Sequence, residues 1–176
     1  GLLGTLVEKL SKQRFDIYVK NNILNPLNIS GSFNVQDISN INNLATLYRN
    51  SEAQTDDYKG IKPSPRDFSK YNIGDNALIF SPQGGLRVSA TDLSKLMLMF
   101  MNDGEYNGIR IIDSSTVSLM FNSQWKFNGQ NGDNYHNMFN EWGLGFHIIT
   151  NSLNGDIIFN DTKMVGHAGD AYGLIS

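Results

Sequence analysis

The residues best suited to chemistry lie near the end of the sequence, in the stretch "MVGHAGDAYG" at 164–173. His167 stands between two glycines and is followed by Asp170. Glycines let a ligand or a second backbone approach a strand closely, and a histidine beside them can exchange a proton near neutral pH. The residues alone leave two interpretations open: a tight structural turn beside a strand, or one wall of an active site.

The three histidines, His136, His147 and His167, show no metal-ligand spacing, and no H-E-x-x-H motif occurs. The chain has no cysteine, so disulfides and thiolate metal ligands are excluded. We therefore predict no metal and no other cofactor. His147 is expected to be a structural residue in a strand, and His136 is expected in a polar loop.

Two glycine clusters resemble phosphate-binding loops only weakly. "PQGGLR" at 82–87 lacks the following Lys and Ser/Thr, and "GLGF" at 143–146 leads into a strand rather than opening a helix. No G-x-S-x-G nucleophile elbow occurs either. Both glycine clusters are expected to serve turns and close packing.

Composition limits the class of protein. The chain has 176 residues, 40% of them hydrophobic, with a formal net charge of -3, which suits a globular domain. It has no Lys/Arg run of the kind that follows a phosphate backbone, so nucleic-acid binding is not expected. The longest apolar run, 96–101, ends at Asn102 and is too short to span a membrane, so we predict no transmembrane segment in these residues.

The first half of the chain is predicted to be helical at its start and irregular afterwards. Residues 1–24 favour two short helices, and Pro26 prevents further helix. We expect the first helix to pack through an apolar face made by Leu3, Leu6, Val7 and Leu10. Residues 28–80 are rich in Asn, Ser and Asp with weak periodicity, which is typical of a long irregular stretch.

The clearest local signal is a helix that begins after Ser89. Asp92 stands three residues on, as in a capping box, and the apolar pattern ends at Asn102. Asn107 and Gly108 predict a tight turn, and a further short helix is expected from Asp113 or Ser114.

The last part of the chain changes to a strand pattern. The runs at 143–150 and 155–161 predict a hairpin, and "KMVGHAG" supplies a third strand. Helices before strands predict an α+β protein, with a helical part over 1–141 and the first sheet strands over 142–176. Both ends stop within or beside an element, so we expect the chain to be an excerpt of a longer protein.

Several segments, read in order, resemble the serine β-lactamase and penicillin-binding-protein superfamily, in its branch of class C β-lactamases, D-alanyl-D-alanine carboxypeptidases and esterases. These segments are "GLLGTLVEKL", "LATLYR", "GGLRVSATDLSKL", "WGLGFHI" and "GHAGDAYGLIS". The resemblance implies a β-lactamase/transpeptidase-like fold, of which this chain holds helical subdomain and part of the antiparallel sheet, truncated at both ends.

The resemblance also implies roles for the residues singled out above. His167, Ala168 and Gly169 match the family's third motif, where His167 supplies a hydrogen bond or partial positive charge and Gly169 leaves room for an acyl group. The backbone N–H of Asp170 is expected to be one oxyanion-hole donor. Ala168 replaces the usual Thr or Ser, which removes a contact to a substrate carboxylate and argues against strong β-lactamase activity.

In the family, the nucleophile motif S-x-x-K and the motif Y-x-N precede the segment that Gly1 begins, so we expect both to be absent here and the chain to be inactive alone. The parent protein is then a serine hydrolase acting on a β-lactam, a D-Ala peptide of the peptidoglycan kind, or a small ester. The alternatives are a non-catalytic binding or regulatory relative, and a stable fragment with no function of its own. Family members of this kind are commonly exported, which favours an exported or periplasmic location.

Overall fold

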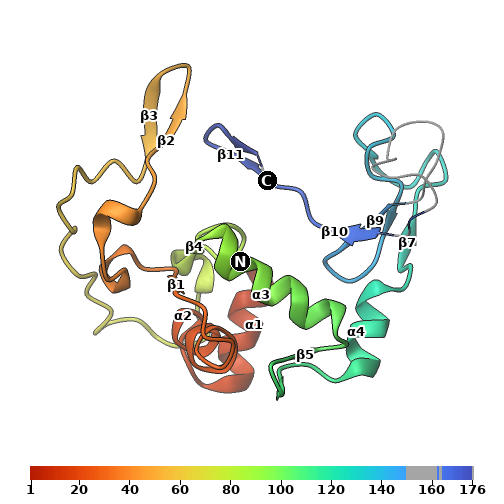
Figure 1. Ribbon diagram of the computed structural model, residues 1–176, viewed down its shortest axis with the longest axis horizontal. Coiled ribbons are helices and arrows are strands. Elements are labelled where there is room, and N and C mark those ends of the chain that lie inside the picture. Colours follow the sequence, from red (N-terminus) through yellow and green to blue (C-terminus); the bar gives the residue numbers. More distant parts are fainter. Residues whose placement is uncertain (150–161, 163, 176) are drawn as a thin grey trace. The chain divides into compact units, whose positions relative to one another are not determined.

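The computed structural model describes residues 1–149, 162 and 164–175 (Figure 1). It divides into two compact units, Gly1–Ile111 and Ile112–Ser176. The strand predicted at 155–161, and with it the predicted hairpin, lies outside the described residues. The mixture of helices and antiparallel strands confirms the α+β class.

The first unit contains three α-helices, a π-helical turn, three short 3-10 helices and three strand pairs. The helical elements are α1 (Leu2–Ser11), α2 (Phe15–Val19), η1 (Lys20–Leu24), η2 (Val35–Asp37), η3 (Ile41–Asn43), η4 (Ala77–Phe80) and α3 (Ala90–Met101). The antiparallel pairs are β1 (Gly31–Ser32) with β4 (Arg87–Val88), β2 (Leu47–Arg49) with β3 (Glu52–Thr55), and β5 (Glu105–Tyr106) with β6 (Ile109–Arg110).

The described residues of the second unit form one helix, a four-stranded sheet and a small hairpin. The helix is α4 (Ser114–Phe121). The sheet has the order β10-β9-β8-β7, formed by β7 (Trp125–Lys126), β8 (Glu141–Trp142), β9 (His147–Ile149) and β10 (Met164–Gly166), and the hairpin joins β11 (Asp170–Ala171) to β12 (Leu174–Ile175). Because β7 already belongs to this sheet, sheet structure starts before residue 142. The division into a helical part, 1–141, and a sheet part, 142–176, stays a prediction. It differs from the two compact units, which are separated at residues 111 and 112 by their contacts.

The face that α1 buries differs from the prediction. Leu3 and Leu10 are 76% and 77% exposed, whereas Gly4 and Glu8 are buried. A Cβ on Gly4 would lie 2.7 Å from the Pro82 ring, so only glycine permits this approach. The expectation of packing through the leucines is therefore wrong, because a close backbone approach and polar contacts hold this helix.

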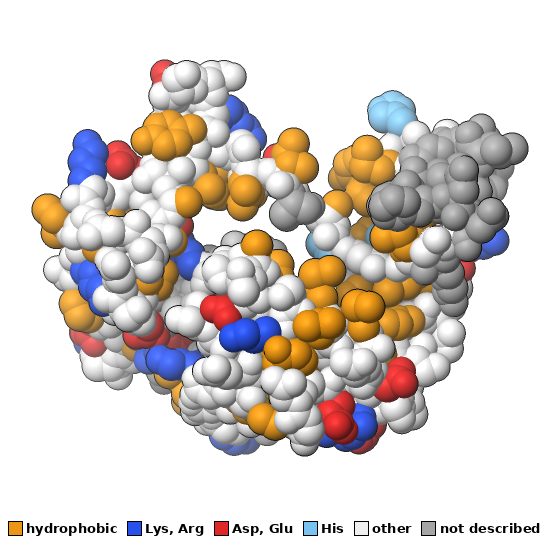
Figure 2. Space-filling model, viewed as in Figure 1, with side chains coloured by type: hydrophobic (Ala, Val, Ile, Leu, Met, Phe, Trp, Pro, Cys, Tyr) orange, Lys and Arg blue, Asp and Glu red, His pale blue; other side chains and the backbone are white. Residues whose placement is uncertain are grey.

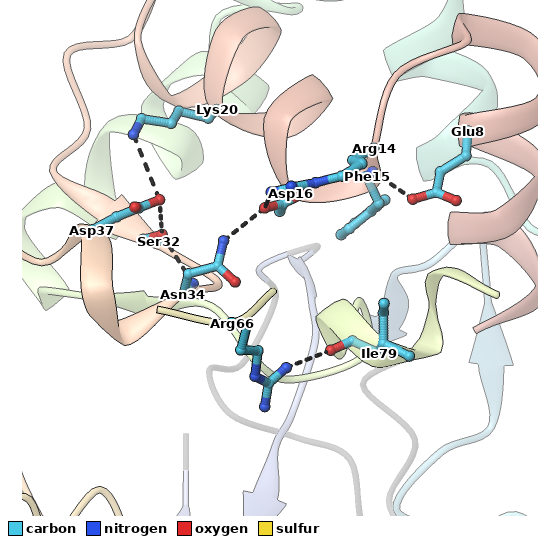
Figure 3. Close-up of polar contacts among 10 residues, drawn as sticks. All are labelled: Glu8, Arg14, Phe15, Asp16, Lys20, Ser32, Asn34, Asp37, Arg66 and Ile79. Atoms are coloured by element: carbon cyan, nitrogen blue, oxygen red, sulfur yellow. Dashed lines mark hydrogen bonds and ion pairs between the residues drawn. The ribbon is translucent and has the colours of Figure 1, made fainter. Parts of the chain in front are cut away.

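Those polar contacts centre on the buried carboxylate of Glu8 (Figure 3). It accepts hydrogen bonds from the Phe15 N–H at 2.8 Å, the Tyr71 hydroxyl at 2.5 Å and the Gly74 N–H at 2.8 Å. Burial, followed by the hydrogen bond to Glu8, raises the pKa of Tyr71 from 10.0 to about 12. The carboxylate thus ties α1 to two segments, one of them more than sixty residues away in the chain.

A second polar cluster joins the half-buried Arg14 to the buried Asp16. Arg14 donates two hydrogen bonds to Asp16, at 3.1 and 2.7 Å, and Asp16 also accepts from the Asn34 side-chain amide at 2.7 Å (Figure 3). The hydrogen bonds that Arg14 donates to Asp16 raise the pKa of Arg14 above its ordinary value. The guanidinium carbon lies 4.2 Å from the ring centroid of Phe68, a cation–π contact.

The predicted signals at α3 and the turn after it are confirmed. The Ser89 side chain accepts from the Asp92 N–H at 3.0 Å at the start of α3. The Asp92 carboxylate also accepts hydrogen bonds from the Ser30 N–H and from Lys95. Asn107 and Gly108 have φ values of 50° and 79° and join β5 to β6.

Apolar side chains are also exposed on α3. Four large apolar side chains of this helix are between 40% and 75% exposed: Leu93, Met97, Leu98 and Met101. Hydrophobic side chains gather over α3 in the face seen in Figure 2. Across the described residues, no helix combines the length and the apolar composition that a membrane crossing requires.

Candidate active site

The segment singled out at 164–173 begins as a strand and leaves the sheet at His167. Strand β10 pairs with β9 and ends at Gly166, which lies opposite His147. Residues 167–169 lie between strands, and Asp170 starts the hairpin β11–β12. His167, Ala168 and Asp170 are exposed and Gly169 is half-buried, so this segment is accessible from solvent.

His167 contacts a residue that the sequence reasoning did not assign to the site. Its ring lies edge-on to the Trp142 indole, with centroids 5.7 Å apart and an interplanar angle of 72°. Trp142 pairs with His147 across β8 and β9, so both side chains project from the same face of the sheet. The ring of His147, which is buried, lies 5.6 Å from the indole.

Open space lies beside Gly166, the residue before His167. Gly166 occupies the position opposite His147, where a side chain would project from the face that carries Trp142. A Cβ added there would meet no atom within 4 Å. The packing of the protein would therefore accept a side chain at this position. Glycine leaves this space beside His167 open.

The backbone of Asp170 faces away from its partner strand. A two-residue turn of Tyr172 and Gly173, with φ values of 55° and 89°, closes the hairpin, so Ala171 and Leu174 form the hydrogen-bonded pair. The next pair, Asp170 with Ile175, is then of the non-hydrogen-bonded kind. The N–H of Asp170 consequently points away from β12, as a donor to a bound group has to.

The other two histidines lie in different surroundings. His147 is buried in β9 between the rings of Phe139 and Trp142, as expected of a structural strand residue. His136 is exposed in a loop and has a φ of 58°. In the part of the chain that the structure describes, no three His, Asp or Glu side chains gather as metal ligands would.

The expectation that S-x-x-K and Y-x-N are absent is wrong, because residues with both spacings occur in the sequence. The first spacing occurs at Ser123–Lys126, and the second occurs at 48–50 and 135–137. A Ser and a Lys three residues apart face each other on a helix, but Lys126 lies in strand β7 and its Nζ is 3.8 Å from a Glu141 oxygen. The helical geometry that brings a lysine to a serine is therefore missing at Ser123.

The fold combines helices with an antiparallel sheet, and the edge strand β10 leads into the H-A-G-D segment at 167–170, beside the Trp142 indole. Residues 1–175 match the Beta-lactamase family, and the chain belongs to it. This confirms the β-lactamase and penicillin-binding-protein resemblance and the corresponding fold.

Two relatives show the extent of the likeness. The chain is 34% identical over 103 residues to Beta-lactamase-like protein 1 of Dictyostelium discoideum, which covers 56% of this chain and 14% of that protein. It resembles the solved structure of the octameric penicillin-binding protein homologue from Pyrococcus abyssi with a TM-score of 0.60 and 26% identity, over 96% of this chain and 31% of that one. The chain thus spans less than a third of the length of either.

Proposed function

We propose that this chain is part of a serine hydrolase that works through an acyl-serine intermediate on a β-lactam, a D-Ala peptide or a small ester. Membership of the Beta-lactamase family supports a hydrolase of this fold. The observation that carries the proposal is the segment at 167–170, which leaves the sheet beside Trp142 with the Asp170 N–H turned outward.

In this proposal His167 donates a hydrogen bond, or supplies partial positive charge, at the edge of the site. The N–H of Asp170 stabilises the oxyanion that develops when the carbonyl is attacked. Ala168 and Gly169 line the path of the substrate, and glycine leaves room for the acyl group. We place the attacking serine of S-x-x-K and the tyrosine of Y-x-N outside these 176 residues.

The experiment is covalent labelling of the full-length protein with a fluorophosphonate or a penicillin, followed by peptide mass spectrometry. We expect one adduct, on the serine of an S-x-x-K motif outside residues 1–176. Ser123→Ala is the matched control and should label as the unchanged protein does, because Ser123 is followed by a strand rather than a helical turn.

Absence of any covalent adduct would overturn the proposal and favour the second candidate, a binding or regulatory relative without catalysis. An adduct on Ser123 itself would contradict the assignment of the nucleophile. Ala168, which lacks the hydroxyl of Thr or Ser, favours an ester or peptide over a β-lactam, so turnover of p-nitrophenyl esters should exceed that of nitrocefin.

A further inference from the structure

We infer that a polar pocket in the first unit, formed by residues 33–36, Tyr58, Arg66 and Arg87, binds a small oxyanion, a carboxylate or phosphate group. The pocket has a volume of about 60 Å³. A single water needs about 10–15 Å³ measured in this way, so the space suits a few waters or one group of a few heavy atoms. This inference does not depend on the proposed hydrolase function.

Two guanidinium groups from separate parts of the chain meet at this pocket. Arg87 is held by Asp56 through two hydrogen bonds, at 3.0 and 2.8 Å, and its Nη1 donates to the Gly85 carbonyl at 2.8 Å. Arg66 donates from Nη1 to the Ile79 carbonyl at 2.9 Å (Figure 3). Arg87 is held on several sides, since its Nη1 also donates to the Phe33 carbonyl at 3.4 Å, whereas Arg66 is held through Nη1 alone among the described contacts.

The charges around the pocket do not cancel. Asp56, with a side chain only 7% exposed, pairs with Arg87. Arg66 makes no ion pair with any described residue, and its Nε and Nη2 donate no hydrogen bond to the described part of the chain. Guanidinium groups bind carboxylate and phosphate oxygens through paired N–H donors, which is the arrangement that Arg66 leaves available.

The loop that carries Arg66 is held against the opposite wall. The Gln36 amide donates to the Ser64 carbonyl at 2.8 Å, and the Lys62 ammonium donates to the Gln36 carbonyl at 3.4 Å. Pro63 and Pro65 restrict the backbone on both sides of Ser64. Lys62 adds a positive charge beside the pocket. Like Arg66, it makes no ion pair with an acidic residue in the described part of the chain.

The test is isothermal titration calorimetry of the full-length protein with inorganic phosphate and, separately, with acetate, at constant ionic strength. Arg66→Gln is compared with Arg49→Gln, since Arg49 is an exposed arginine of β2 and the two variants lose the same charge. We expect saturable one-site binding that Arg66→Gln weakens about tenfold or more and Arg49→Gln leaves unchanged.

A preference for acetate identifies the ligand group as a carboxylate, and a preference for phosphate identifies it as a phosphate group. The inference is overturned if neither anion saturates, or if the two variants lose affinity equally, because general charge screening would then account for the heat. Circular dichroism of both variants shows that a loss of binding is not a loss of fold.

Discussion

The two compact units differ in their buried charged groups, because both buried carboxylates of the described residues, Glu8 and Asp16, lie in the first. In the first, buried carboxylates are the junctions: Glu8 joins three segments and Asp16 joins Arg14 to Asn34. In the second, the rings of Phe139, His147 and His167 each contact the Trp142 indole.

The comparison shows where each unit tolerates change. When a buried carboxylate that accepts several hydrogen bonds is removed, all of its donors lose their partner. Its removal should therefore lower the free energy of unfolding. An exposed histidine at the edge of an aromatic cluster can be removed with little effect on stability. Its removal should therefore lower the proposed activity rather than the free energy of unfolding. Stability and proposed activity should therefore be separable by unit.

The largest effect is expected at Glu8. Glu8→Ala leaves three donors without their acceptor in a buried place, so we expect the free energy of unfolding to fall by about 3 kcal/mol or more. Urea denaturation followed by circular dichroism measures this. Glu52→Ala, at an exposed position of β3, should change stability by less than about 0.5 kcal/mol. Equal losses in the two variants would contradict the role given to Glu8.

The next effect concerns the proposed site in the second unit. His167→Ala in the full-length protein is expected to lower kcat/KM for an ester substrate about 100-fold, because the hydrogen bond or partial positive charge proposed for His167 at the edge of the site is lost. Its unfolding midpoint should hardly move, since His167 is exposed. His136→Ala removes another exposed histidine and should leave both quantities unchanged; a matching loss of activity there would remove the distinction between the two histidines.

Tyr71 tests the polar junction through pH. Its pKa is raised from 10.0 to about 12, so the stabilisation present below pH 10 should be lost as the pH rises from 10 to 12. Tyr71→Phe is expected to lower the free energy of unfolding by about 1.5 kcal/mol at neutral pH and to weaken its decline above pH 10.

Chemical denaturation at several pH values between 7 and 12 measures both effects. Tyr48→Phe is the control, because Tyr48 is exposed on β2. An unaltered alkaline decline in Tyr71→Phe would show that another group causes it.

The smallest effect compares the helix starts of the two units. Ser89→Ala removes the side-chain acceptor at the start of α3 and should cost about 1 kcal/mol. Asp113, at the start of α4, makes no side-chain cap hydrogen bond, so Asp113→Ala should cost only about 0.3 kcal/mol through the helix dipole. Thermal unfolding of both variants decides this, and the opposite order of losses would refute it.

The features that the residues determined locally were predictable. The start of α3 at Ser89, the turn at Asn107 and Gly108 and the start of α4 after Asp113 each follow from side chains and backbone preferences within a few residues. The order of motifs along the chain was likewise sufficient for the family and the fold, both of which are confirmed.

Only the tertiary structure decided which surfaces and side chains meet. The leucines of α1 suggested a buried apolar face, but Gly4 and Glu8 are buried because Pro82, Tyr71 and Gly74 approach that side from more than sixty residues away. The contact of His167 with Trp142 depends in the same way on three strands pairing in register. Such contacts depend on close packing between segments that are distant in the sequence. The hydrophobic periodicity of one segment does not indicate which other segment will pack against it.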